Sequence, residues 1–113
     1  MKIHDDFDCI VTIVNKGHCD PVVTASRAAG AEGGTILMAR GTGIREVKSI
    51  MGIAIQPEKE IILTLVKSDI SATVLQAIVE AGNLEKPGTG IAFILPVKGL
   101  AGICHLDTCL GAS

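Results

Sequence analysis

The order of apolar segments along the chain restricts the fold more than any other feature of the sequence. Four short runs rich in β-branched residues predict strands, at residues 9–14, 35–39, 60–66 and 91–97. A helical segment separates the first two runs, and another separates the last two. The resulting β-α-β-β-α-β order predicts an α+β domain of the ferredoxin-like type, with a four-stranded antiparallel sheet and both helices on one face.

The two predicted helices carry different start and stop signals. Asp20 is a suitable N-cap for the first helix, directly before a proline that fits the first helical position. The second helix is predicted over residues 70–81, where apolar residues recur at helical spacing. Ser68 or Asp69 is expected to cap its start, and Gly82 is expected to end it.

The predicted strands are apolar on both faces, which bears on assembly. In the third strand, Ile61, Leu63 and Leu65 alternate with Ile62 and Val66. An antiparallel sheet covered on one face normally alternates apolar with polar residues. Two helices on one face leave the other face exposed, so we expect a second copy of the chain to cover it.

Composition excludes several classes of function. The 113 residues carry 10 basic and 12 acidic side chains and two aromatic ones, so neither a basic stripe nor a base-stacking platform suggests nucleic acid as a partner. Uncharged apolar runs are too short to span a bilayer, and the amino-terminal segment lacks the features of a signal peptide, so a cytoplasmic protein with reduced cysteines is expected. Catalytic triads, P-loops and zinc-ligand spacings are absent from the sequence, and an enzyme is not expected.

Glycine clusters are the strongest local signal for a binding site. Two glycines precede Thr35, a Gly-Thr-Gly triplet occupies 41–43, and Lys-Pro-Gly-Thr-Gly occupies 86–90. Glycine lets backbone N–H groups approach an anion closely, and a nearby lysine supplies positive charge. Each cluster alone is more typical of a turn, but together they indicate a phosphate-binding cleft.

These motifs resemble those of the PII signalling family over roughly the first hundred residues. Gly33-Gly34-Thr35, Gly41-Thr42-Gly43 and Pro57-Glu58-Lys59 match the segments that frame the family's mobile T-loop, and 86–91 resembles its phosphate-binding B-loop. The resemblance implies a homotrimer that binds ATP, ADP or AMP between subunits, with the role of Mg²⁺ left open. It implies that Thr35 meets the adenine and that the phosphates are lined by Gly41, Thr42, Gly43, Lys59, Lys86, Gly88, Thr89 and Gly90.

The chain departs from the family pattern at charged positions. Arg45 stands where the family has a glutamine that supports Mg-ATP and 2-oxoglutarate, and Ile91 replaces a B-loop lysine. Gly102 and Cys104 replace two basic residues that reach the phosphates in the family. Because each charge-assisted hydrogen bond is worth about 1.5–3 kcal/mol, triphosphate binding should be weaker than in typical members. With no tyrosine in the chain, uridylylation of a loop tyrosine is excluded.

The resemblance also divides the chain, into a PII-like domain at 1–100 with a long central loop at 42–58, and a flexible tail at 101–113. The central loop is unusually apolar, and it is predicted either to pack on its own subunit or to dock on a membrane transporter or metabolic enzyme that the protein regulates, as in nitrogen regulation by the family. The docking residues would be Ile44, Arg45, Ile50, Met51 and Ile53.

Other interpretations share the same order of elements. An ACT-like module that binds a small metabolite would lack the long loop and the lysine-glycine loop. A CutA-like trimer would bind metal, although the sequence offers no metal cluster. Cys104 and Cys109, five positions apart in the tail, could instead form a redox pair or stay as reduced thiols.

Overall fold

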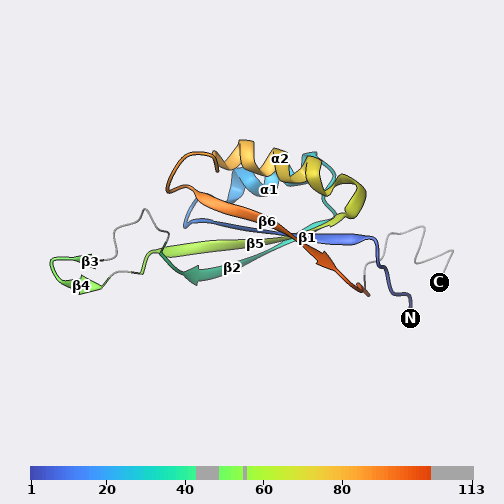
Figure 1. The fold of residues 1–113 in the computed structure, drawn as a ribbon, viewed down its shortest axis with the longest axis horizontal. Helices are drawn as coiled ribbons and strands as arrows, with labels where there is room; N and C mark the ends of the chain where they lie inside the picture. The colour runs from blue at the N-terminus through green and yellow to red at the C-terminus, as the bar shows by residue number, and fades with distance from the viewer. Residues whose placement is uncertain (43–48, 55, 103–113) are drawn as a thin grey trace.

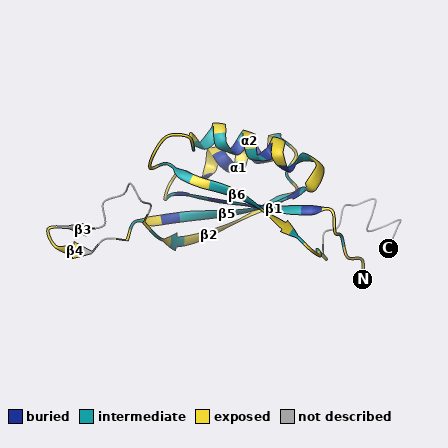
Figure 2. Cartoon of the chain, in the orientation of Figure 1, coloured by how far each residue is buried: buried dark blue, intermediate teal, exposed yellow. Residues whose placement is uncertain are grey.

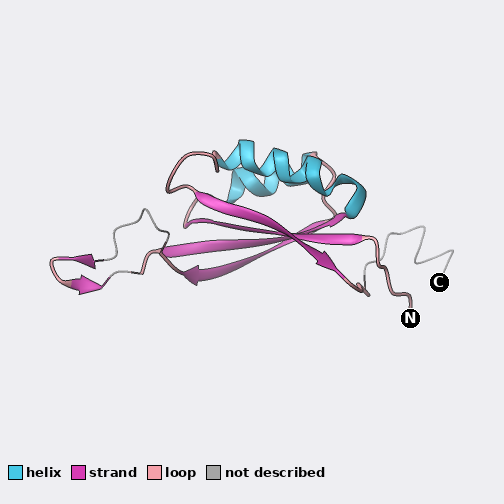
Figure 3. Cartoon of the chain, in the orientation of Figure 1, coloured by secondary structure: helices cyan, strands magenta, loops and turns pink. Residues whose placement is uncertain are grey.

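The computed structural model describes residues 1–42, 49–54 and 56–102, and it has the predicted ferredoxin-like architecture. Figure 1 shows one sheet with both helices on the same side, and Figure 3 shows the strands and helices as two separate layers. The elements are β1 (Phe7–Asn15), α1 (Cys19–Ala28), β2 (Gly33–Arg40), β3 (Ser49–Ile50), β4 (Ile53–Ala54), β5 (Glu58–Lys67), the 3₁₀ turn η1 (Ser68–Ile70), α2 (Ser71–Gly82) and β6 (Gly90–Val97).

The main sheet has the strand order β2-β5-β1-β6, and its strand pairs are antiparallel. This order places β1 and β5 at the centre and leaves β2 and β6 at the edges. The centre of the sheet therefore comes from two strands that lie far apart in the sequence. The ends of these two strands meet where Asn15 pairs with Lys59.

The core lies between the helices and one face of the sheet. Figure 2 shows the buried positions gathered along the inner sides of α1 and α2 and along the central strands. Along most of β1 and β5, every second residue points into this layer and is buried, as expected for strands whose side chains alternate between two faces. The core cluster comprises Ile10, Val14, Cys19, Val22, Ile62, Val66, Val74 and Ile78.

The opposite face of the sheet is apolar and uncovered in the single chain, as the sequence predicts. Strand register places Val11, Leu63 and Phe93 side by side on this face. Its outer strand β6 exposes Ile91 by 58% and Leu95 by 48%. We call this surface, formed by alternate residues of the four strands, the open face.

The start of α1 differs from the prediction. Asp20 is not the N-cap, because the helix begins at Cys19 and His18 occupies the cap position without a side-chain cap hydrogen bond. The carboxylate of Glu60 takes that role from β5, accepting hydrogen bonds from the backbone N–H groups of Gly17 at 2.8 Å and Cys19 at 3.3 Å. A residue 41 positions further along the chain therefore satisfies the amino end of the helix.

The start of α2 also differs from the prediction, whereas its end lies within one residue of the predicted one. Ser68 and Asp69 do not cap the helix but form the 3₁₀ turn that precedes it. At the other end, Gly82 is the last helical residue, and Asn83 takes the left-handed conformation that ends the helix. A Cβ atom on Gly82 would lie 3.3 Å from Cγ2 of Val22, so this glycine lets the two helices pack closely.

The central loop, predicted only as a long loop at 42–58, contains a short hairpin. The two-residue strands β3 and β4 pair across a turn at Met51 and Gly52, both with positive φ. Figure 1 places this hairpin well away from the helices and the main sheet. The interpretation in which the loop packs on its own subunit is therefore wrong for the hairpin. Residues 43–48, 55 and 103–113 lie outside the described part of the chain, and so does most of the predicted tail.

The Glu60 contacts predict a pH-dependent contribution to stability. Burial raises the pKa of Glu60, but the hydrogen bonds from Gly17, Cys19 and His18 outweigh it, so the pKa lies below its ordinary value of 4.5. The carboxylate therefore stabilises the fold above pH 4.5, and this contribution is lost as the pH falls through the lowered pKa. Glu60→Ala should lower the free energy of unfolding by about 1 kcal/mol at pH 7, as for loss of an N-cap.

Urea denaturation at pH 7 and pH 3 measures this difference. The gap between wild type and Glu60→Ala should narrow at pH 3, whereas Glu85→Ala, which removes an exposed glutamate, should change little at either pH. An equal gap at both pH values would contradict the capping role.

Candidate functional site

A cavity of about 480 Å³ lies at the end of the sheet where the central loop begins and ends. Three segments border it: the end of β2 with Gly41 and Thr42, the start of β5 with Lys59, and the loop that leads into β6. Ile13, Ile61 and Ile91 also line the cavity. Strand register places these three isoleucines side by side on the open face, so the cavity is continuous with that face.

The structure brings together most of the residues predicted to bind a ligand. Those that line the cavity are Gly41, Thr42, Lys59, Lys86, Gly88 and Gly90. Thr35 is not among the lining residues, although it lies on the same face of β2 as Ala39, which is. Gly43 lies outside the described residues.

The loop at residues 86–90, which we call the glycine loop, is held in shape by hydrogen bonds to backbone carbonyl groups within it and at Asn83. The left-handed Asn83 turns the chain out of α2, and its carbonyl accepts a hydrogen bond from the N–H of Lys86 at 3.0 Å. The Thr89 hydroxyl lies 2.8 Å from the carbonyl oxygens of both Asn83 and Lys86. Thr89 thus holds the loop in shape and does not line the cavity, so a ligand contact from Thr89 stays a prediction.

Two positions of this loop require glycine for different structural reasons. Gly88 has φ +81° and open space where a Cβ atom would lie. Gly90 has φ +150°, and a Cβ atom there would lie 2.3 Å from the carbonyl oxygen of Ile13. Gly90 is therefore required by the approach of β6 to β1, whereas Gly88 leaves the cavity side of the loop open.

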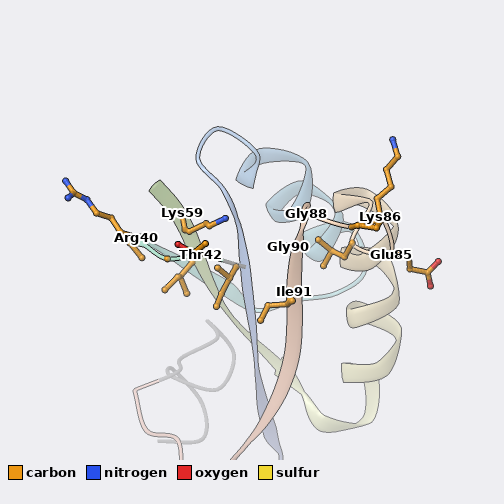
Figure 4. Close-up of a pocket in the computed structure, with 14 residues that line it drawn as sticks. Arg40, Thr42, Lys59, Glu85, Lys86, Gly88, Gly90 and Ile91 are labelled. Carbon is orange, nitrogen blue, oxygen red and sulfur yellow. The ribbon is translucent and has the colours of Figure 1, made fainter. Parts of the chain in front are cut away.

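Cationic side chains surround the cavity. In Figure 4, Arg40 and Lys86 extend outward on opposite sides, while Lys59 lies between them. Lys59 is only 8% exposed, and its ammonium donates a hydrogen bond of 2.6 Å to Oδ1 of Asn15. Three lining cations outnumber the one lining carboxylate, Glu85, so the charge of the rim suits an anion.

Sequence reasoning missed two residues of this region. Asn15 ends β1 and bonds to two of the segments that border the cavity, and Arg40 adds a cation to its rim. The sequence marks Asn15 only as the first residue of an Asn-Lys-Gly turn. Its partners come from β5 and the glycine loop, and no local pattern identifies them.

Two observations on the described residues bear on metal and redox chemistry. Residues 1–42, 49–54 and 56–102 contain no group of three or more His, Cys, Asp or Glu placed to hold a metal ion. Burial raises the pKa of the Cys19 thiol to about 11, so it stays protonated at neutral pH. The predicted redox pair, Cys104 and Cys109, lies outside the described part of the chain. Neither α1 nor α2 is a long apolar helix of the kind that crosses a membrane, and the same holds throughout the described ranges.

Fold and cavity together define a small ferredoxin-like domain with a glycine-framed cleft beside a long loop. The family model for nitrogen regulatory protein P-II matches residues 7–103, so the chain belongs to the P-II nitrogen regulatory protein family. Proteins of this family are regulatory proteins that bind nucleotides and act on partner proteins as trimers.

Comparison with solved structures agrees with the family assignment. The structure is similar to that of Arabidopsis thaliana PII bound to citrate, with a TM-score of 0.64 and 26% sequence identity. The match covers 83% of this chain and 79% of the Arabidopsis chain. A search of the curated proteins finds no match.

The two glycines predict different outcomes when each gains a methyl group. Gly90→Ala should lower the free energy of unfolding by about 3 kcal/mol, because strain at its φ adds to the clash with Ile13. Gly88→Ala should cost about 1 kcal/mol, the strain of a left-handed backbone alone. Chemical denaturation of the two variants measures both values, and equal losses would show that the approach of β6 to β1 does not depend on Gly90.

Proposed function

We propose that this protein is a PII-type regulator that senses an adenine nucleotide in the cavity and controls a partner protein through its central loop. The observation that carries this proposal is that one cavity is bordered by both ends of the central loop and by the glycine loop. A ligand held there contacts the base of the loop directly. Its binding energy is therefore available to change the loop's preferred conformation.

The chemistry of the cavity suits a nucleotide with one or two phosphate groups. The apolar wall of Ile13, Ile61 and Ile91 suits a base or ribose, while the glycine loop and the rim cations suit phosphate. Ile91 adds no charge where a lysine is expected from family resemblance. AMP or ADP should therefore compete well with ATP, and whether Mg²⁺ accompanies the nucleotide depends on the number of phosphates. The citrate bound to Arabidopsis PII is also a small anion, which is consistent with anion binding here.

The assembly we propose is a homotrimer formed through the open face. Burial of apolar surface stabilises by about 25 cal/mol per Å², so an uncovered apolar sheet favours association. Because the cavity is continuous with the open face, a neighbouring copy on that face would contribute to the wall of each site. The cavity seen in one chain is then one side of an intersubunit cleft.

The central loop is the proposed contact with the regulated partner, a membrane transporter or a metabolic enzyme. Its hairpin tip exposes Met51 by 96% and Ile53 by 70%. A non-glycine residue with φ +52°, as at Met51, costs about 1–2 kcal/mol, so an apolar side chain is held at the tip against its backbone preference. Of the other predicted docking residues, Ile50 belongs to β3, while Ile44 and Arg45 lie outside the described residues.

The trimer can be tested by placing a charge on the open face. Leu63→Asp should convert the assembly to monomers, because an unpaired carboxylate would be buried at the interface. Ala72→Asp, which adds the same charge on an exposed position of α2, should leave the assembly unchanged. Light scattering on both variants measures the oligomeric state. A wild-type protein that runs as a monomer at micromolar concentration would overturn the assembly and the intersubunit site.

The ligand can be tested by melting the protein with nucleotides, because a ligand that binds only the folded state raises the melting temperature. AMP, ADP or ATP should bind with micromolar affinity, and ATP should show little cooperation with 2-oxoglutarate, since Arg45 replaces the glutamine expected from family resemblance.

Lys86→Gln should weaken nucleotide binding by about tenfold, the effect of losing one charge-assisted hydrogen bond. Lys98→Gln, away from the cavity, is the matched control. No melting shift with any adenine nucleotide would contradict the proposed function.

A further inference from the structure

The side chain of Asn15 joins two segments that border the cavity from opposite sides. Its Oδ1 accepts a hydrogen bond from the Lys59 ammonium at 2.6 Å. Its Nδ2 donates a hydrogen bond to the carbonyl oxygen of Gly88 at 3.1 Å. Lys59 and Gly88 both line the cavity, whereas Asn15 does not. One amide group therefore connects the two segments from outside the cavity.

The chemistry of the three groups permits only one orientation of this amide. An ammonium group can only donate a hydrogen bond, and a carbonyl oxygen can only accept one. The oxygen of Asn15 must therefore face Lys59, and its nitrogen must face Gly88. Aspartate at this position would keep the contact with Lys59 and lose the donor to Gly88, and an apolar residue would lose both.

The Lys59 end of this link is tied to the base of the central loop. The backbone N–H of Gly41 donates to the carbonyl oxygen of Pro57 at 3.1 Å, which closes the base of the loop two residues before Lys59. Next to Asn15, Lys16 holds Glu58 by an ion pair of 3.0 Å. The end of β1 thus fixes the start of β5, where the central loop rejoins the sheet.

The Gly88 end of the link lies at the most permissive point of the glycine loop. A residue with φ +81° and no Cβ atom has many alternative conformations, so its peptide orientation depends on hydrogen bonds. The N–H side of this peptide, on Thr89, donates a long hydrogen bond of 3.4 Å to the Lys86 carbonyl, and the shorter bond of 3.1 Å from Asn15 holds the Gly88 carbonyl side. The neighbouring Thr89 hydroxyl bonds to Asn83 and Lys86, so it does not take this role.

We infer that Asn15 is a positioning residue that couples the glycine loop to the base of the central loop through the chain Lys59–Asn15–Gly88. An anion that draws the Lys59 ammonium toward the cavity weakens its bond to Asn15 and frees the amide that orients Gly88. Conversely, a ligand that reorients the Gly88 peptide changes the position of Lys59 through the same amide. The nucleotide part of this inference rests on the proposed function, whereas the coupling is a property of the protein without ligand.

The coupling is tested without ligand by a double-mutant comparison. Lys59→Met removes the ammonium, and the amide nitrogen chemical shift of Thr89 reports on the hydrogen bond accepted by the preceding Gly88 carbonyl. Lys59→Met should shift the Thr89 signal in the wild-type background and leave it unchanged in the Asn15→Ala background. Lys16→Gln, which removes the adjacent ion pair to Glu58, should not shift it in either background. An equal shift in both backgrounds, or no shift in wild type, overturns the inference.

A second measurement separates the coupling from the proposed function. Nucleotide titration should change the amide signals of both Gly41 and Thr89 in wild type. In Asn15→Asp both signals should still change, because Gly41 and Gly88 line the cavity, but affinity should fall roughly three- to tenfold, the effect of one lost hydrogen bond. Unchanged nucleotide affinity in a folded Asn15→Asp variant would contradict the coupling. If no nucleotide binds wild type, the proposed function fails, while the ligand-free comparison still decides the coupling.

Discussion

The sheet of this protein has apolar side chains on both faces, and its two helices cover only one of them. Ile62 and Val66 of β5 are fully buried under the helices. Leu63 and Leu65, which lie between them in the sequence, face the other way. The covered layer forms the core of the single chain, and the open face is the surface through which we propose that copies of the chain associate. The candidate cavity lies at one end of this open face, so the proposed assembly and the proposed ligand site would share the same surface.

A small number of polar contacts at the end of the sheet complement this apolar core. The carboxylate of Glu60 accepts hydrogen bonds at the amino end of α1, and the amide of Asn15 accepts one from Lys59 and donates one to Gly88. Each contact joins segments from different parts of the chain. They fix the ends of β1 and β5 against the loops that border the cavity, where apolar packing alone would leave the loops free to shift.

Much of the candidate site could be predicted from the sequence, because glycine-rich turns and lysines are visible in it. Gly41, Lys59 and Gly88 were predicted from their resemblance to PII loops, and the structure places them around one cavity. Thr89 was predicted by the same resemblance, yet its hydroxyl braces the loop. Asn15 was missed because its sequence neighbours look the same whether its side chain faces solvent in a turn or bonds to distant segments.

The sequence by itself determined the order of the four main strands and two helices, their approximate positions, and the apolar character of both sheet faces. These follow from propensity and periodicity, which act between residues a few positions apart. Only the tertiary structure decided that Glu60 caps α1 from 41 positions away and that Asn15 faces both Lys59 and Gly88. Such contacts depend on the register between strands and on the path of loops, and these are set by the packing of the whole sheet rather than by any local stretch of the chain.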